Sequence, residues 1–341
     1  MKVVHIESGL GNQMLSYSEL LLLKKLNGDD DYYIETIIYE IPECKEIINQ
    51  WYGYELSRIF NIDTPNISSL FSCKEWENII NDIRKTKFWE NWNYPDTFVD
   101  AFNRRGMNLV NYRGSIDLNV HNNLKAKITN NKLGYFIKRV LRPLYQDSYI
   151  KKMSNKKEMF LKTTDNVYTG QWLGLMKEDS GIEFIEDDIR NTFCFPKLEG
   201  KQNLELEKLI ATTNSVAIHA RRGDALGTNG YCYKYGYFKR AINYIKRKVE
   251  NPVFIFFTDP GSIQWCRNNE KIFGLDFRKD KIVFVDWNGG EDSYRDMQLM
   301  SYCKHNIITF SSFGWWGAWL NKNSDKITIS PSVWINTTHH I

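Results

Sequence analysis

Short apolar runs alternate with helical patterns over the C-terminal part of the chain. The predicted strands lie at Val216–Ala220, Val253–Thr258, Ile282–Asp286, Asn306–Phe310 and Lys326–Ile329. Between two of them, apolar residues three or four positions apart predict a helix over Tyr237–Val249. Strands that alternate with helices are typical of a parallel sheet with helices on both faces. The pattern therefore predicts an α/β domain over residues 204–341.

The beginning of the chain has the same order of elements. Lys2–Glu7 is predicted to be a buried strand, and a glycine turn follows it. A helix is then predicted to begin at Asn12 or Gln13. From residue 31 to residue 195 the pattern is less regular, which favours a loop-rich domain with insertions.

A linker is predicted where these two patterns meet. Phe195–Asn203 contains Pro196 and Gly200, which interrupt regular structure. We therefore predict an N-terminal domain over residues 1–196 and a C-terminal domain over residues 204–341. We leave open that the last helix packs back on the N-terminal domain.

Composition narrows the class of protein. The 341 residues include 42% hydrophobic and 25% charged residues, which is typical of a globular protein and excludes a disordered or fibrous one. The six cysteines contain no Cys-x-x-Cys pair, so reduced thiols in a cytoplasm are the simplest interpretation. The chain begins without the long apolar region of a signal peptide, and no apolar run is long enough to span a membrane. We expect a cytoplasmic protein, soluble or peripheral to the membrane.

The net charge of +4 is unevenly distributed. Residues 125–162 contain eleven basic and two acidic residues, a local charge of +9, so the rest of the chain sums to −5. A general nucleic-acid binder would be basic over a wider surface, so we expect no nucleic-acid partner. Two interpretations of residues 125–162 stay open: a surface for anionic lipid or a lipid-linked glycan, and a solvated helical face.

Chemistry in a parallel sheet is expected where the strands end. After the strand at Val216–Ala220 come Arg221, Arg222 and Asp224, and His219 lies just before them. Arginine has a planar set of donors that fits phosphate oxygens and keeps its charge at any physiological pH. The segment therefore predicts an anchor for a diphosphate, with an Arg–Asp pair that merely stiffens the turn as the alternative.

A second set of residues surrounds the later strands. Asp296 lies on a predicted helix, and its carboxylate can accept hydrogen bonds from both N–H donors of guanine. Two hydroxyls and an aromatic ring after the next strand can hold a phosphate and cover a purine: Ser311, Ser312 and Phe313. Asp259 is either a helix cap or a ligand residue, and three nearby tryptophans are expected to pack in the core: Trp315, Trp316 and Trp319.

The glycine turn near the N-terminus is the third candidate. In the sequence Ser8–Gln13, Gly9 and Gly11 let the backbone approach a ligand, and the helix that follows presents free N–H groups to an anion. The turn matches a dinucleotide-binding fingerprint only in part, because Met14 stands at the third glycine position.

Together these motifs resemble glycosyltransferase family 11. The resemblance is carried by four segments, and it is strongest over residues 215–321: His219–Asp224, Phe257–Asp259 with Trp265, Asp296–Leu320 and the opening Gly9–Met14. Members of this family that the chain resembles are bacterial α-1,2-fucosyltransferases that use GDP-fucose. Four positions depart from the family pattern and concern acceptor preference and fine donor geometry: Ser8, Ala225, Pro260 and Gly314.

The resemblance implies a fold and a set of roles. The fold would be GT-B-like, with two Rossmann-type domains whose parallel sheets face a central cleft. Arg221 would contact the β-phosphate, and Asp296 would recognise guanine. Asn12 would act on the sugar from the opposite domain. The remaining substrate-binding residues would be Gly11, Gln13, His219, Arg222, Asp224, Asp259, Ser311, Ser312 and Phe313.

The expected reaction is transfer of L-fucose from GDP-β-L-fucose to the 2-hydroxyl of a terminal galactose. It would invert the anomeric centre and need no metal or other cofactor, and the acceptor would be an oligosaccharide or a surface-polysaccharide precursor. Asp29–Asp31 is interpreted as a solvated loop and not as a metal motif. The general base stays unassigned among Glu7, His219 and Asp224.

Three alternatives stay open from the sequence. The chain could form another fucosyl linkage. It could also be a non-catalytic protein that binds GDP-sugars or glycans. An NAD-dependent oxidoreductase is the third alternative, and the missing third glycine and the lack of a clear ribose-binding acid count against it.

Overall fold

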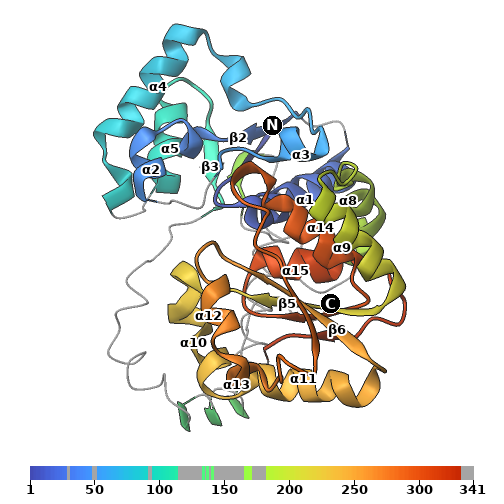
Figure 1. The fold of residues 1–341 in the computed structure, drawn as a ribbon. Helices are drawn as coiled ribbons and strands as arrows, with labels where there is room; N and C mark the ends of the chain where they lie inside the picture. Colours follow the sequence, from blue (N-terminus) through green and yellow to red (C-terminus); the bar gives the residue numbers. More distant parts are fainter. Residues whose placement is uncertain are drawn as a thin grey trace. The chain divides into compact units, whose positions relative to one another are not determined.

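The computed structural model divides the chain into two compact units, Met1–Cys194 and Phe195–Ile341 (Figure 1). The boundary falls at the residue where the predicted linker begins. The structure describes residues 1–28, 31–47, 52–90, 94–113, 133–134, 136–137, 140–141, 165–170 and 182–331. Most of the basic segment, the last ten residues, Asp29 and Asp30 lie outside the described residues.

Unit 1 contains a parallel four-stranded sheet in the order β2-β1-β4-β3. Its strands are β1 (Lys2–His5), β2 (Tyr32–Glu35), β3 (Leu109–Asn111) and β4 (Asn166–Thr169). Its α-helices are α1 (Leu10–Asn27), α2 (Pro42–Ile47), α3 (Leu56–Phe60), α4 (Cys73–Lys85), α5 (Tyr94–Asn103) and α8 (Glu186–Thr192). Short 3₁₀ helices are η1 (Ile37–Tyr39), η2 (Ile67–Leu70), η3 (Phe88–Glu90) and η6 (Ile182–Ile185).

The first strand and helix of unit 1 follow the predicted order. All four residues of β1 are buried, as expected for the inner strand of a parallel sheet. Helix α1 begins at Leu10, earlier than predicted, because Gly9 adopts an extended conformation at its N-cap. The helix ends at Gly28, whose φ of 60° favours glycine.

Unit 2 contains a parallel five-stranded sheet in the order β7-β6-β5-β8-β9. Its strands are β5 (Asn214–Ala220), β6 (Pro252–Thr258), β7 (Lys281–Phe284), β8 (His305–Ile308) and β9 (Thr328–Ile329). Its α-helices are α9 (Lys201–Thr212), α10 (Leu226–Lys234), α11 (Tyr237–Lys248), α12 (Ile263–Arg267), α13 (Glu270–Phe273), α14 (Tyr294–Tyr302) and α15 (Ser312–Trp319). Two 3₁₀ helices are η7 (Gly223–Ala225) and η8 (Gly290–Asp292).

Helices cover both faces of the unit 2 sheet. Alternate residues of β6 enter two separate cores: Phe254 and Phe256 pack with α11, whereas Val253, Ile255 and Phe257 pack with α9 and α14. The prediction of two α/β units with parallel sheets is therefore confirmed. Because α9 already begins at Lys201, the irregular connection is shorter than the predicted linker.

The strand order places the carboxyl edge of the unit 2 sheet at a topological switch. Strands β6 and β7 lie on one side of β5, and β8 and β9 lie on the other, so the connections after β5 and β8 leave in opposite directions. Ligands of open α/β sheets bind outside the carboxyl ends of the strands at such a point.

Candidate functional site

Arg221 and Asp259 form an ion pair at the ligand edge of the unit 2 sheet. Arg221 follows β5, Asp259 follows β6, and a guanidinium nitrogen of Arg221 donates to Asp259 Oδ1. The second oxygen, Oδ2, accepts from the backbone N–H of Arg222 at 2.7 Å. The Asp259 side chain is 1% exposed, whereas the Arg221 side chain is 24% exposed. The buried carboxylate therefore orients a cation that reaches the surface.

This arrangement decides between the two interpretations of Asp259. It does not cap the helix that follows Pro260, because α12 begins only at Ile263 and has no side-chain cap. The cap interpretation is wrong, because both oxygens of Asp259 bind the segment after β5 instead.

Arg222 has a different environment from Arg221. Its guanidinium lies 3.3 Å from the ring centroid of Trp265 and 5.0 Å from that of Tyr233. Such stacking stabilises the cation on aromatic faces and leaves its edge for planar hydrogen bonds. Tyr233 also donates from its hydroxyl to the Arg221 carbonyl at 2.9 Å, so it contacts the backbone of Arg221 and the side chain of Arg222.

Thr309 links the segment after β5 to the segment after β8. Its hydroxyl accepts from the Arg221 N–H at 3.1 Å and donates to the His219 carbonyl at 3.0 Å. Asn229 adds a second link, because its amide group accepts from the Phe310 N–H and donates to the Phe310 carbonyl, each at 3.0 Å. These bonds join the two sides of the topological switch into one surface.

His219 is buried beneath this surface. Burial, followed by the nearby Arg221 charge, lowers its pKa to about 3, so the imidazole is neutral at physiological pH. Its Nδ1 has no hydrogen-bond partner among the described residues. The ring lies 5.8 Å from that of Phe313, measured between centroids. This close packing explains Gly314, because a Cβ there would overlap Nδ1 and lie 2.9 Å from Cγ of His219.

Ser311, Ser312 and Phe313 form the beginning of α15. Ser311 precedes the helix and its side chain makes no cap bond, while Ser312 and Phe313 occupy the first turn. All three residues are half-buried, so part of each side chain is accessible. They follow β8, which pairs with β5, the strand that precedes Arg221. The tryptophans of α15 are 0–5% exposed, which confirms the prediction that they pack in the core.

Asp296 lies on α14 at the end of a chain of amide hydrogen bonds. Its Oδ1 accepts from Asn288 at 2.8 Å, and Asn288 also donates to Asn203 Oδ1 at 3.0 Å. The indole N–H of Trp287 donates to the same Asn203 oxygen at 2.7 Å. Burial raises the pKa of Asp296 to about 7, although the Asn288 hydrogen bond lowers it.

The predicted site residues of unit 1 differ in how accessible their side chains are. Asn12 is half-buried at the start of α1, and Gly11 beside it is buried. Gln13 is fully buried, and its amide binds Ser8 O at 3.0 Å, Gly53 O at 2.8 Å and Glu55 N at 2.9 Å. This corrects the prediction that Gln13 binds substrate, because it is buried and its polar atoms hold the loop together.

Ser8 also has a structural explanation. Its φ is 65°, a left-handed conformation in which glycine has no steric cost. The hydroxyl of Tyr39 and the amide of Gln13 both donate to the Ser8 carbonyl, at 2.6 and 3.0 Å. These bonds hold the turn in a conformation that serine rarely adopts.

Glu7 belongs to a buried network at the carboxyl end of β1. One oxygen accepts from Arg113 and the other from the hydroxyl of Tyr94. Arg113 also donates to the Gly170 carbonyl at 2.8 Å, which ties the network to the segment after β4. Burial raises the pKa of Glu7, but Arg113 and His5 outweigh it and lower the pKa to about 2. Glu7 is therefore a permanently charged structural group and a poor general base.

His5 and Glu35 extend this network. His5 Nδ1 hydrogen-bonds Glu35, and Tyr168 donates to the same Glu35 oxygen at 2.8 Å. Burial by itself lowers the pKa of His5, but Glu35 and Glu7 raise it overall. Two buried carboxylates therefore face the Arg113 guanidinium and the His5 imidazole, whose pKa they raise.

Several residues of both sites were not predicted from the sequence. In unit 2 they are Asn203, Asn229, Tyr233, Asn288 and Thr309, and in unit 1 they are His5, Glu35, Tyr94, Arg113 and Tyr168. Asn288 follows a predicted strand closely, so the rule that directed us to Asp259 could have found it. Thr309 lies within the strand predicted at Asn306–Phe310, and the others lie on helices, on strands or far along the chain, where nothing local indicates a role. The Asp224 side chain lies outside the described residues.

Comparison with protein families decides the class of the molecule. The model of glycosyl transferase family 11 matches residues 115–340, which is 226 of the 341 residues. The chain belongs to glycosyl transferase family 11. This confirms the resemblance drawn from the motifs.

Individual relatives match a shorter part. An α-1,2-colitosyltransferase of Escherichia coli is 42% identical over 137 residues, which cover 38% of this chain and 44% of that protein. The O-antigen biosynthesis glycosyltransferase WbnK of Escherichia coli is 38% identical over 134 residues, 37% of this chain and 41% of that protein. Galactoside α-(1,2)-fucosyltransferase 1 of Ateles belzebuth is 30% identical over 110 residues, which cover 31% of this chain and 28% of that protein. The matched parts span less than half the length of these relatives.

Among solved structures, NodZ α-1,6-fucosyltransferase co-crystallised with GDP is 12% identical, with a TM-score of 0.43 over 94% of this chain and 91% of that one. The fucosyltransferase NodZ from Bradyrhizobium is 12% identical, with a TM-score of 0.44 over 94% of this chain and 92% of that one.

The Glu7 network predicts a loss of stability in acid. A carboxyl whose pKa is about 2 when folded and 4.5 when unfolded stabilises the fold above pH 4.5 and loses that contribution as the pH falls through 2. The shift corresponds to about 3 kcal/mol in the free energy of unfolding. Urea unfolding at pH 5 and pH 2.5 should therefore show a steeper loss for the wild type than for Glu7→Gln.

Glu77→Gln is the matched control, because Glu77 is exposed on α4 in the same unit. It should lose stability between pH 5 and pH 2.5 as steeply as the wild type does. Equal losses for the wild type and Glu7→Gln would contradict the role assigned to Glu7.

Proposed function

We propose that this chain transfers L-fucose from GDP-β-L-fucose to the 2-hydroxyl of a terminal galactose on a glycan. The main support is the Arg221–Asp259 pair at the topological switch of unit 2, in a member of glycosyl transferase family 11. Unit 2 would bind the donor, and unit 1 would bind the acceptor. The GT-B arrangement, with the two sheets facing a cleft, stays a prediction.

Arg221 would stabilise the leaving group. As the bond between fucose and the β-phosphate breaks, positive charge develops on the sugar and negative charge on the phosphate oxygens. A guanidinium that Asp259 holds in place can bind this charge without reorganising. Arg222 and the first turn of α15, with Ser311, Ser312 and Phe313, would bind the rest of the nucleotide.

The acceptor hydroxyl would attack the face of the anomeric carbon opposite the diphosphate, which inverts the β-linked donor to an α-fucoside. Asn12, half-buried at the start of α1, would hydrogen-bond the sugar during the attack. Glu7 does not serve as the base that takes the hydroxyl proton, because both of its oxygens are occupied. We assign no base.

No metal takes part in the proposed reaction, since Arg221 supplies the positive charge that a metal would otherwise provide. Within the described ranges, no three His, Cys, Asp or Glu side chains are grouped to hold an ion.

A second donor is favoured by one comparison. The relative that is 42% identical is an α-1,2-colitosyltransferase, and colitose is fucose without its 3-hydroxyl. A site that hydrogen-bonds that hydroxyl would reject the deoxy sugar strongly, whereas a site without such a bond would accept both. Assaying GDP-fucose and GDP-colitose side by side would distinguish these possibilities.

Arg221→Lys should reduce transfer at least 100-fold while the melting temperature stays within a few degrees, because lysine keeps the charge beside Asp259 but loses the planar donors. Release of GDP from GDP-fucose in the presence of lactose, with the product linkage assigned by NMR, measures this. EDTA should leave the rate unchanged.

Arg221→Ala should abolish transfer, and pairing it with Asp259→Asn removes the carboxylate that would otherwise be left buried and unpaired. Full activity in Arg221→Ala would exclude the proposed role of the arginine. An EDTA-sensitive rate would exclude the metal-free reaction.

GDP binding should depend on pH through Asp296. The carboxylate must be charged to accept both guanine N–H groups, and its pKa in the free protein is about 7. The dissociation constant should therefore rise about tenfold for each pH unit below 7 and level off above it. The charged groups near α14 do not interfere, since Arg295 pairs with Asp292 at 2.9 Å and with Glu199 at 3.4 Å.

Isothermal titration of GDP from pH 5.5 to pH 8.5 tests this. Asn288→Leu removes the hydrogen bond that lowers the Asp296 pKa and should move the midpoint upward. Asp296→Asn should flatten the profile, and an unchanged profile in that variant would contradict guanine recognition by Asp296.

The basic segment is proposed to contact the cytoplasmic membrane or a lipid-linked acceptor. Four apolar side chains described within it are 46–68% exposed and follow helical spacing: Leu133, Phe136, Ile137 and Val140. Apolar side chains among lysines and arginines are typical of helices that lie on anionic membranes. No helix in the described part of the chain is long and apolar enough to cross a bilayer.

Vesicles of phosphatidylglycerol should therefore sediment the protein at low salt, and vesicles of phosphatidylcholine should not, because attraction to anionic lipid is screened by salt. Phe136→Ser should reduce the bound fraction several-fold. Leu70→Ser, at another exposed apolar position, is the control and should bind as the wild type does. Binding that is the same for both lipids and at low and high salt would contradict the proposed contact with an anionic membrane.

A further inference from the structure

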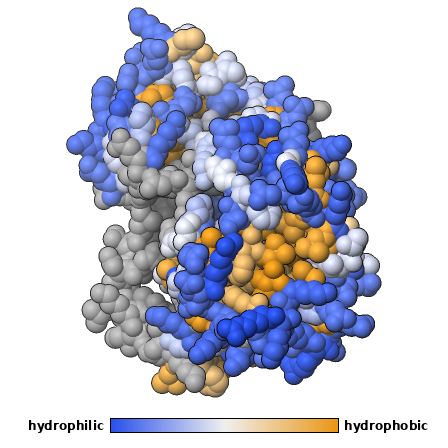
Figure 2. Space-filling model, in the orientation of Figure 1, coloured by the Kyte–Doolittle hydropathy of each residue, from blue (hydrophilic) through white to orange (hydrophobic). Residues whose placement is uncertain are grey.

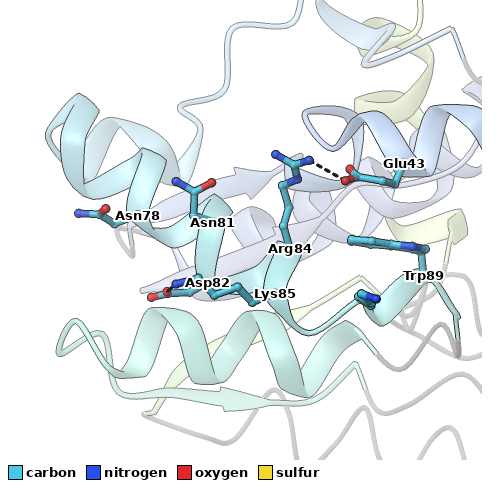
Figure 3. A pocket seen from close by; sticks show the side chains of 8 residues that line it. Glu43, Asn78, Asn81, Asp82, Arg84, Lys85 and Trp89 are labelled. Atoms are coloured by element: carbon cyan, nitrogen blue, oxygen red, sulfur yellow. Dashed lines mark hydrogen bonds and ion pairs between the residues drawn. The ribbon is translucent and has the colours of Figure 1, made fainter.

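Unit 1 contains a polar pocket whose lining residues have no role assigned in the reaction proposed above. Its volume is about 460 Å³, and it lies between α2, α4 and η3 (Figure 3). The lining residues are Glu43, Asn78, Asn81, Asp82, Arg84, Lys85, Lys87 and Trp89. A volume of this size is within the range of small-molecule sites.

One aromatic ring faces a set of planar polar groups in this pocket. In Figure 3, Glu43 and Trp89 lie at one end, and Asn78 and Asn81 lie at the other. Trp89 is half-exposed, and its ring contacts the buried Phe88 edge-on, with centroids 5.4 Å apart. Phe88 in turn packs on Phe98 at 5.1 Å. The indole is therefore anchored on the hydrophobic core of unit 1 while part of it stays accessible.

The polar side chains are also held in place. Arg84 donates to Glu43 at 2.6 Å, and Arg105 donates to Asp82 at 2.8 Å from outside the pocket. Two buried polar atoms at this ion pair, Glu43 Oε2 and Arg84 Nε, have no hydrogen-bond partner among the described residues. The amides, carboxylates and cations that line the pocket supply both acceptors and donors, so the pocket offers both kinds of hydrogen bond to a ligand.

The charge of the pocket argues against an ionic ligand. Two carboxylates, Glu43 and Asp82, face three cations, and two of those cations are already paired with them. The surface of unit 1 around α4 is mainly hydrophilic (Figure 2), which argues against an apolar protein partner. A neutral ligand with many hydroxyl groups can both donate to the acceptors and accept from the donors that line the pocket.

A pyranose sugar has this chemistry. Its C–H groups form an apolar face that stacks on an indole, and its hydroxyls lie around the rim, where amides, carboxylates and guanidinium groups can bind them. We propose that this pocket binds a neutral sugar unit of the glycan acceptor, with Trp89 as the stacking platform and Asn81, Asp82 and Arg84 as hydrogen-bonding groups. The identity of the ligand rests on the proposed glycosyl transfer, whereas the site itself is a separate feature of unit 1.

Saturation-transfer NMR with the full chain tests binding without any donor. Lacto-N-tetraose, a galactose-terminated tetrasaccharide, should give a signal that Trp89→Ala reduces, with the dissociation constant rising roughly tenfold. Asn81→Ala changes an exposed amide with no hydrogen bond shown among the described residues, so it should fold normally and weaken binding too. Trp76→Ala, a half-exposed tryptophan of α4 outside the pocket, is the matched control and should bind as the wild type does.

Transfer kinetics separate this site from the reacting centre. Trp89→Ala should raise KM for the tetrasaccharide and leave kcat, GDP affinity and KM for galactose unchanged. Wild-type binding in both Trp89→Ala and Asn81→Ala would overturn the proposal, and so would an equal loss in Trp76→Ala. A protein that binds the tetrasaccharide through Trp89 but transfers no fucose would contradict the proposed reaction and support the pocket.

Discussion

The pairing of Arg221 with the buried carboxylate of Asp259 is the interaction on which the unit 2 site depends. A carboxylate that is 1% exposed needs a partner, because an unpaired charge in such an environment is costly. The partner is an arginine at the end of the neighbouring strand, where the sheet order places ligands. The constraint that keeps Asp259 paired therefore also holds a cation at the surface, where a diphosphate can reach it.

Unit 1 also pairs a buried carboxylate with an arginine, but its arginine is not accessible. Glu7 lies just after β1 as Arg221 lies just after β5, but here the cation Arg113 is buried as well, at 7% side-chain exposure. The charges of a fully enclosed pair are not available to a ligand, and removing either partner would leave the other charge buried and unpaired. The difference in exposure explains why the same type of ion pair is a candidate site in unit 2 and a structural link between the segments after β1 and β4 in unit 1.

Recognition in the proposed reaction is spread over separate groups. Arg221 would bind the diphosphate, Asp296 the guanine base, and Trp89 a sugar unit of the acceptor. Each group is fixed by its own neighbours: Asp259 orients the arginine, Asn288 and Asn203 orient Asp296, and Phe88 supports the indole. Because these supports do not share residues, substitutions at one of them should change one part of substrate recognition and leave the others intact.

The pattern of the sequence determined the α/β unit after residue 204 and the strand ends where Arg221, Asp259 and Ser311 lie, because periodicity and the position after a strand are local properties. The second sheet, in unit 1, was expected only from the family resemblance, because the pattern between residues 31 and 195 is irregular. The sequence did not determine the partners. Arg113 lies 106 positions from Glu7, and Asn203 lies 85 positions from Asn288. Only the tertiary structure decided that Asp259 binds Arg221 and that Gln13 turns inward, because burial and long-range hydrogen bonds exist only once the chain has folded.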